Sequence, residues 1–434
     1  MKLKLSKKDI KANRGITLIA LVITIIVLLI LAGITIASLT GNNAIISKSG
    51  EAKNASEIAN EKEELEVEVI RFSDKRGNLD PDKVVNGLNK DLKNLKEATN
   101  TNGKFPVKVE YKNGHKYQIT EDGDIFISVD AGDTAPSDSN AVYTSGNYTA
   151  VIPAGFTVSA TESSIENGLV VTDGTTNQNE WVWIPVSSSD LAKMYTEDTT
   201  GWNMLGTSGD TAVNTKLRTR ELTTQNTFKL GNRELKRTNP GLTEDPYYRE
   251  PDVLSDYDTD QKYRTQAGFG NLADMATKLK DDYKDMIDSV RENGGFYIGR
   301  YELGKDSSNN PQVKEGTVRN STNWYNLYSA CKSFSSGKVE ARMIWGCQWD
   351  QVCRFISTLG DNKVSSLDDS TSYGNYSGST DYKTGTRNNC ITNNIYDLAG
   401  NCWEWTQEAY YTSYRAIRGR QLPHWWFQRF SFLS

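Results

Sequence analysis

The sequence predicts an α+β protein in which a long N-terminal helix with a small antiparallel sheet precedes a larger domain. Three observations indicate this fold class. An uncharged apolar segment over 16–39 is followed by a helical pattern that reaches residue 72. Alternating strands flank Asn113-Gly114, the strongest two-residue hairpin signal. Mixed strand and helix patterns fill 141–434, and 434 residues suffice for two or three domains.

The N-terminus predicts a single-pass membrane protein. Residues 1–15 carry six basic side chains against one acid, Asp9, and 16–39 contains no charge over 24 residues. At about 1.5 Å per residue, such a helix crosses a hydrocarbon core of roughly 30 Å. Since basic flanks stay in the cytoplasm, the rest of the chain is expected outside the cell membrane.

A basic leader, a glycine and then a long apolar helix resemble the start of type IV pilins and pseudopilins. The resemblance rests on Gly15, Thr17, Leu18, Ile19 and Leu21. It implies cleavage after Gly15 by a prepilin peptidase, methylation of the new N-terminus at Ile16, and other pilin subunits as partners. Most major pilins have Glu where this chain has Ala20, which suits a permanent anchor or a minor, tip-located subunit. An uncut anchor is the alternative.

Residues 40–130 are expected to form a pilin-like head. Thr40 to Asn43 interrupt the apolar helix, and a helical pattern resumes from Ala44 to about Phe72. A three-stranded sheet is predicted within 108–129, and the alternative is a helical stalk that carries only a hairpin. Residues 131–140 lack large apolar side chains and are expected to be a linker.

The second domain, 141–434, is expected to begin with strands at 151–153, 169–171 and 181–186. The polar stretch 197–270 is interpreted as an insertion. A helix is predicted from Leu272, because apolar residues recur every three or four positions until Gly294-Gly295 stops the pattern. A second helix is predicted around 349–359.

Five segments of this domain resemble the formylglycine-generating enzyme (sulfatase-modifying factor) family. They are NEWVWIPV (179–186), GGFYIGRYELG (294–304), RMIWGCQWDQVCRFI (342–356), NIYDLAGNCWEWT (394–406) and RAIRGR (415–420). The family has a C-type-lectin-like fold, and its GN-x-WEW core is the most specific of these matches. The resemblance therefore implies that fold for about 290 residues, without 197–270.

The GN-x-WEW core has a structural interpretation of its own. Gly400 and Asn401 favour a turn, because both tolerate left-handed backbone. On a strand, Trp403 and Trp405 face one side and form a core motif with Asn401. Glu404 then points to the other side, where its carboxylate is either solvated or bound to a cation.

The family resemblance also implies a calcium ion at this loop. Its ligands here would be the side chains of Asp397 and Glu404 and the backbone carbonyls of Gly400 and Cys402. All are oxygen donors, as a hard cation requires. The alternative is a hydrogen-bonded loop without metal.

The cysteines do not favour an enzyme. Family enzymes use two cysteines beyond the GN-x-WEW core, and this chain has none after Cys402, so a copper site is not expected. The other four, Cys331, Cys347, Cys353 and Cys390, are expected to be buried small residues or to form one disulfide. With a net charge of -5 and no basic run after the leader, nucleic acid is not an expected partner.

The C-terminal tail departs from the family. Residues 421–434, QLPHWWFQRFSFLS, replace the expected Gly- and Ser-rich continuation. The tail is interpreted either as an exposed aromatic cluster for aggregation or membrane contact, or as a truncated or frameshifted end.

Together these features predict a surface-displayed, pilin-like or membrane-anchored protein. Its second domain would bind an extracellular glycan or protein and serve adhesion, on the cell surface or on a pilus. The alternatives are an extracytoplasmic oxidase of the formylglycine-generating type and a structural minor pseudopilin.

Overall fold

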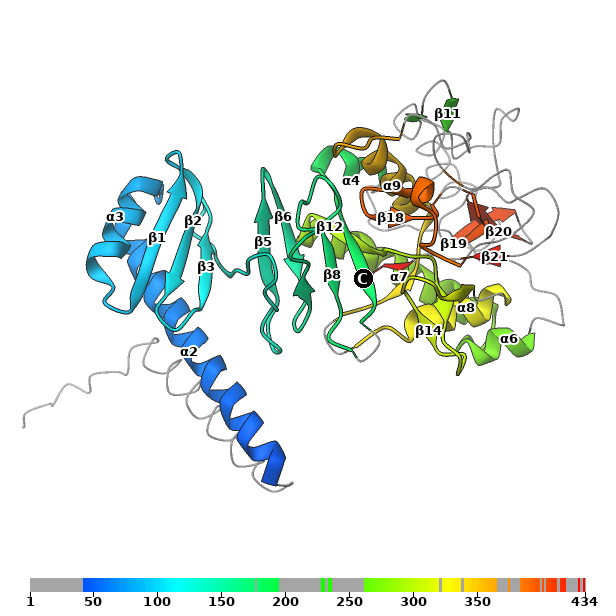
Figure 1. The fold of residues 1–434 in the computed structure, drawn as a ribbon, viewed down its shortest axis with the longest axis horizontal. Coiled ribbons are helices and arrows are strands. Elements are labelled where there is room, and N and C mark those ends of the chain that lie inside the picture. The colour runs from blue at the N-terminus through cyan, green and yellow to red at the C-terminus, as the bar shows by residue number, and fades with distance from the viewer. Residues whose placement is uncertain are drawn as a thin grey trace, which may run out of the picture.

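The computed structural model describes residues 42–175, 178–194, 228–230, 233–235, 261–319, 322–336, 339–364, 374, 383–398, 400–401, 403–411, 414–418, 428–429 and 432–433. Over these residues the chain is an α+β protein with two hydrophobic cores (Figure 1). The predicted leader, the cleavage site at Gly15 and Ile16, and the apolar span 16–39 lie outside them. Among the helices that are described, none is long and apolar enough to span a bilayer.

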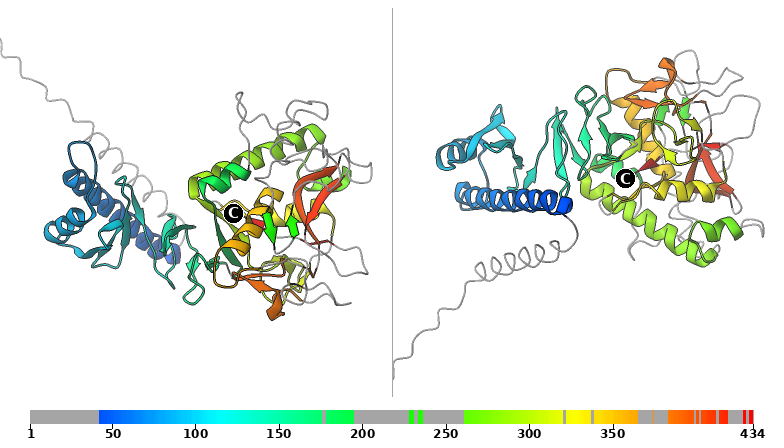
Figure 2. Two further views of the ribbon diagram at one scale, coloured as in Figure 1. Left: turned by 90° about the horizontal axis from the view of Figure 1, so that it is seen from above. Right: turned by 60° about the horizontal axis from the view of Figure 1, so that its bottom comes forward.

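The head, from α2 to β4, contains the smaller core. Helix α2 (Asn42–Phe72) lies along a four-stranded antiparallel sheet, and α3 packs beside β1 (Figures 1 and 2). The other elements are α3 (Pro81–Asp91), β1 (Leu95–Thr101), β2 (Lys104–Tyr111), β3 (Lys116–Ile119) and β4 (Ile125–Ile127). Leu65 of α2 and Leu88 of α3 are fully buried against Tyr117 of the sheet's core. Helix α2 is therefore more than a stalk.

The predicted hairpin is present, and the three strands predicted within 108–129 are found as β2, β3 and β4. Strands β2 and β3 pair around the turn, where Gly114 has φ +93°. Strand β1 adds a fourth strand. The sequence does not predict this strand, because only its residues Leu95 and Ala98 are buried. Helix α3 was also missed, although its start follows a known pattern. The side chain of Asp80 accepts two backbone hydrogen bonds, and Pro81 follows as the first helical residue.

The segment 131–140, expected to be a linker, joins the two cores through fixed backbone contacts. Gly132 N–H donates to the carbonyl of Val158 at 3.0 Å, and Ala135 N–H donates to that of Phe156 at 2.9 Å. Ala135 is 2% exposed. These contacts hold the segment against the second domain, from β5 onward.

The second domain is built on a six-stranded antiparallel sheet in the order β16-β22-β12-β9-β8-β7. Its strands are β7 (Thr157–Val158), β8 (Val170–Thr172), β9 (Glu180–Pro185), β12 (Gly295–Gly299), β16 (Arg342–Met343) and β22 (Phe432–Leu433). A hairpin of β5 (Ala141–Ser145) and β6 (Tyr148–Ile152) stands between the head and this sheet (Figure 1). The three predicted strands correspond to β6, β8 and β9.

Helices flank this sheet. They are α4 (Ser188–Met194), α6 (Gln261–Gln266), α7 (Leu272–Asn293), α8 (Trp324–Lys332) and α9 (Gly346–Thr358). Helix α7 matches its prediction, because Asn271 caps it and Gly294, at φ +70°, ends it. Gly295 then passes close to the ring of Trp183, from which an added Cβ would lie only 2.4 Å away. Helix α9 begins three residues before its predicted start at Trp349.

The remaining described elements are short. They are β10 (Phe228–Leu230), β11 (Arg233–Leu235), β13 (Gly304–Lys305), β14 (Pro311–Gln312), β15 (Val318–Arg319), η2 (Asn388–Cys390), β17 (Ile391–Thr392), β18 (Ile395–Tyr396), β19 (Trp403–Tyr411), β20 (Tyr414–Arg418) and β21 (Gln428–Arg429). Of the predicted insertion 197–270, the pair β10–β11 and the helix α6 are described. The tail supplies β21, which pairs with β19, and β22.

Candidate functional site

The GN-x-WEW core lies in the interior of the second domain. Glu404 on β19 is 1% exposed, and one of its carboxylate oxygens accepts a 2.7 Å hydrogen bond from the indole Nε1 of Trp349. A solvated Glu404 is therefore excluded, because α9 packs against β19 and brings Trp349 onto that carboxylate. Trp405 is partly buried against the core. Cys402 and the side chain of Trp403 lie outside the described residues.

Two further acids are buried at the turn before β19: Asp397, which belongs to the turn, and Glu302, which follows β12. Asp397 is 2% exposed and accepts hydrogen bonds from Gly385 N–H at 2.8 Å and the Thr384 hydroxyl at 3.2 Å. The side-chain amide of Asn401, fully buried, donates to the carboxylate of Glu302 at 3.2 Å. Glu302 was not predicted. Its signal in the sequence was a carboxylate three residues after the apolar strand β12.

The electrostatics of this cluster favour neutral acids or a bound cation. The pKa of Glu404 is raised to about 8, mainly by burial and also by the nearby charge of Asp397, while the bond from Trp349 opposes the shift. Burial also raises the pKa of Asp397, against the hydrogen bonds from Gly385 and Thr384.

The donors at this cluster suit calcium by their chemistry. Asp397 and Glu404 are carboxylates, and Gly400, at φ +79°, and Asn401, at φ +61°, form a left-handed turn between them. Within the described part of the chain, however, no group of three His, Cys, Asp or Glu side chains is placed to hold a metal ion. Backbone oxygens would have to complete the ligand set.

The four described cysteines are buried. Cys331, Cys347, Cys353 and Cys390 are at most 1% exposed and are not joined to one another by disulfides. The pKa of Cys390 is raised to about 12, mainly by burial and also by the charge of Asp397. Burial also raises the pKa of Cys331. Buried neutral thiols are poor nucleophiles and poor metal ligands.

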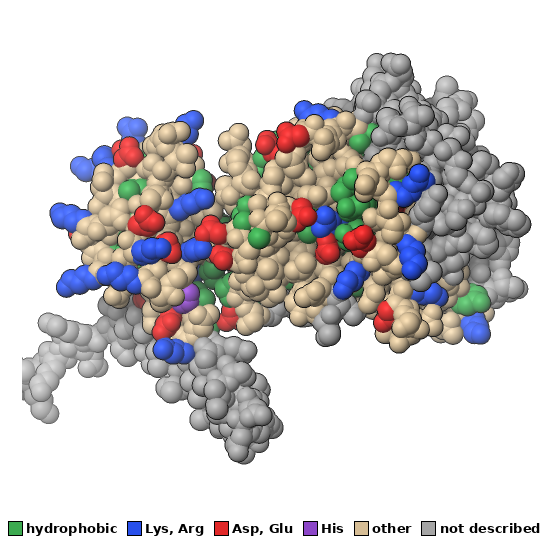
Figure 3. Space-filling view, in the orientation of Figure 1, with side chains coloured by type: hydrophobic (Ala, Val, Ile, Leu, Met, Phe, Trp, Pro, Cys, Tyr) green, Lys and Arg blue, Asp and Glu red, His purple; other side chains and the backbone are tan. Residues whose placement is uncertain are grey.

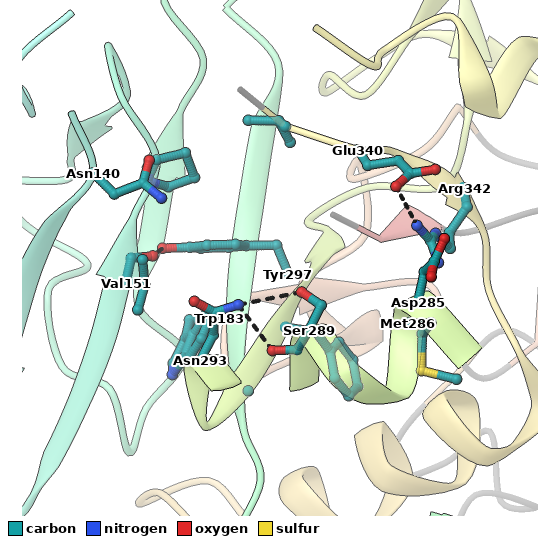
Figure 4. A pocket seen from close by; sticks show the side chains of 14 residues that line it. Asn140, Val151, Trp183, Asp285, Met286, Ser289, Asn293, Tyr297, Glu340 and Arg342 are labelled. Atoms are coloured by element: carbon teal, nitrogen blue, oxygen red, sulfur yellow. Dashed lines mark hydrogen bonds and ion pairs between the residues drawn. The ribbon is translucent and has the colours of Figure 1, made fainter. Parts of the chain in front are cut away.

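A hollow of about 150 Å³ opens where α7, β6 and the segment before β16 meet. It is lined among others by Asn140, Asp285, Ser289, Asn293, Glu340 and Arg342. Asn140 faces Glu340 and Arg342 across it (Figure 4). Glu340 pairs with Arg342 at 2.8 Å, and the side-chain amide of Asn293 donates to the Ser289 carbonyl at 2.8 Å.

A second hollow of about 200 Å³ adjoins the first and is more apolar. Trp181, Phe156 and Phe334 line it, and Tyr297 and Val339 line both hollows. Tyr297 is held in place because its hydroxyl donates to the carbonyl of Val151 at 2.8 Å.

Sequence reasoning missed both hollows, although one signal was available. Asp285, Ser289 and Asn293 recur every four residues along α7, beside its apolar stripe. The charged residues that line the first hollow are two acids and one Arg. The head differs, because Lys and Arg side chains gather over it on the face shown in Figure 3.

Comparison with known proteins gives no match to any family model, curated protein or solved structure.

Proposed function

We propose that the chain is a single-pass cell-surface protein that presents its second domain as a non-catalytic, C-type-lectin-like ligand-binding domain for adhesion. The observation that carries this proposal is the pair of adjoining hollows, which share Tyr297 and Val339. Concave sites with a few placed polar groups are the usual form of a binding site.

The N-terminal segment would hold the second domain at the cell surface. The leader with Gly15 and the apolar span 16–39 precede α2, which begins at Asn42 and forms part of the head's core. The span would anchor the head at the outer surface of the membrane. Cleavage before Ile16 would instead allow the chain to join a pilus with other subunits.

Calcium at Asp397 and Glu404, with the carbonyls of Gly400 and Cys402, would have a structural role in this function. It would neutralise buried carboxylates at the turn before β19. The oxidase alternative needs accessible thiolates, and the buried thiols of Cys331 and Cys390 support the non-catalytic function instead.

A binding screen tests the proposal. The full chain, purified in detergent micelles, is applied to glycan arrays and to arrays of extracellular proteins, with and without calcium. Saturable binding to one class, competed by soluble ligand, is the expected result. A lack of binding to either class, combined with loss of pili on deletion of the gene, would favour the structural pseudopilin.

A further inference from the structure

The two hollows of the second domain differ in chemistry and share a wall. Tyr297 and Val339 line both. The first hollow presents charged and amide groups, and the second presents Trp181, Phe156 and Phe334. A ligand that fills both must carry a polar group and an apolar group side by side.

The size of each hollow matches one amino-acid side chain. Their volumes are about 150 Å³ and about 200 Å³. Pockets for drug-sized ligands and cofactors have roughly 300–1,000 Å³. Two small adjoining sites therefore fit two side chains on one face of an extended peptide, where alternate residues point the same way.

The charge of the first hollow favours a basic side chain. Arg342 is already neutralised, because it pairs with Glu340 at 2.8 Å and donates to the carbonyl of Asp282. Asp285 is exposed at the same hollow and forms no ion pair with any described residue. Lys284, the preceding residue on α7, interacts with the Asp285 charge but makes its close pair with Asp288 at 2.6 Å. The Asp285 carboxylate itself can therefore attract a Lys or Arg side chain and repel an acidic one.

The aromatic lining does not suit a sugar ring. Sugars stack on the exposed face of an aromatic side chain. Trp181, Trp183 and Tyr297 are at most 5% exposed, and Trp183 and Tyr297 already pack edge-to-face at 4.9 Å. Among the other rings that line the apolar hollow, Phe156 and Phe334 are partly exposed, and Phe334 already packs edge-to-face against Trp181 at 5.5 Å.

We propose that the two hollows are adjoining subsites for an extended peptide segment of a partner protein. A basic side chain of the peptide enters the first hollow beside Asp285, and an aliphatic or aromatic side chain enters the second hollow beside Trp181. This proposal rests on the proposed function, since it names the ligand class of the same binding domain.

A peptide library tests the subsites on the full chain in detergent micelles. The library fixes Lys at one position and Leu two positions later, and matched sets replace Lys by Gln or Glu, or Leu by Ser. The variant Asp285→Asn removes the proposed counter-charge. Its control is Asp281→Asn, an exposed acid one turn earlier on α7 that lines neither hollow.

The second subsite has its own pair of variants. Ser336→Trp adds bulk at the exposed rim of the apolar hollow, and Ser329→Trp places the same side chain on an exposed position of α8 outside it. Thermal unfolding of each variant distinguishes loss of binding from loss of folding.

The expected result is selection of peptides with Lys and Leu. Asp285→Asn should weaken their binding about threefold to fivefold, as for an exposed ion pair, and leave the Gln peptides unchanged. Ser336→Trp should weaken binding by more, and both controls should bind like the parent chain. Binding of glycans but no peptides would overturn this proposal and leave the proposed function standing. Peptide binding that ignores both Asp285→Asn and Ser336→Trp would overturn the subsites alone, and no ligand of any class would count against both proposals.

Discussion

The indole nitrogen of Trp349 donates a 2.7 Å hydrogen bond to the carboxylate of Glu404. The bond links α9 to β19, and its two residues are 7% and 1% exposed, respectively. A single carboxylate thus joins a helix to a strand in the interior, and its charge state affects the stability of the domain.

In the metal-free chain, the stability of the second domain should fall as pH rises from about 4.5 to about 8. Burial raises the pKa of Glu404 to about 8 in the folded chain, whereas the unfolded chain releases this proton near 4.5. The folded state holds the proton more tightly, so the stabilisation is complete below the lower value and is lost toward the upper one. The slope is at most about 1.4 kcal/mol per pH unit.

Glu404→Gln should remove most of this slope, because the amide oxygen still accepts the bond from Trp349 and carries no charge. The free energy of unfolding, measured in a chelator at about pH 5 and about pH 8, checks the prediction. An equal pH dependence in both chains would contradict it.

Calcium should stabilise the second domain if it binds at Asp397 and Glu404. A cation offsets the cost of two buried charges, and at a concentration 100-fold above its dissociation constant it would add about 2.7 kcal/mol. The midpoint of thermal unfolding should therefore rise with calcium and fall again with chelator.

Two comparisons make the calcium test specific. Glu404→Gln should lose most of the calcium response, and Glu340→Gln, which alters an acid 52% exposed, should keep it. Magnesium should act weakly, because it retains its water. A calcium response that survives Glu404→Gln would place the ion elsewhere.

Local patterns predicted the helix α7 and the β2–β3 hairpin, because the signals lie within those segments. Gly294 stops the helix and Gly114 forms the turn, both with positive φ. The burial of Glu404 could not be predicted this way. Alternation along β19 distinguishes its two faces. The second face is also buried because Trp349 of α9 packs onto it, and this contact forms only in the folded chain.

The two hollows could not be predicted from the sequence for a similar reason. Their lining comes from residues as far apart as Asn140 and Arg342, and each has an ordinary role in its own segment. The signal for the predicted metal loop was stronger, since Asp397 and Glu404 lie close together in the chain. Glu302, in contrast, is distant in the chain and reaches Asn401 of this loop only through folding.

Leu65→Ala should destabilise the head by about 2–5 kcal/mol, because the Leu65 side chain is fully buried between α2 and the sheet. Val67→Ala is the matched control on the same helix, since Val67 is 60% exposed and its loss should cost less than about 0.5 kcal/mol. Hydrogen exchange of the amides in β2 and β3 measures the effect within the head. Equal protection in the two variants would mean that α2 does not stabilise the sheet.

The native chain should resist alkylation at the four described cysteines. Cys331, Cys347, Cys353 and Cys390 are buried, and burial raises the pKa of Cys390 to about 12. Mass spectrometry of peptides from chains alkylated before and after denaturation should find these thiols modified only after denaturation. Rapid native modification of two of them would revive the oxidase alternative.

The mature N-terminus should be Ile16 if the leader is processed as in pilins. Mass spectrometry of the chain from intact membranes and from the shed fraction measures this directly, including an N-methyl group. Gly15→Leu should retain the leader, because the proposed cut follows that glycine. Gly33→Leu, which changes a glycine within the apolar span, should leave the cut in place. A parent chain that still begins at Met1 would make the span a plain anchor, and the second domain would then act at the cell surface without a pilus.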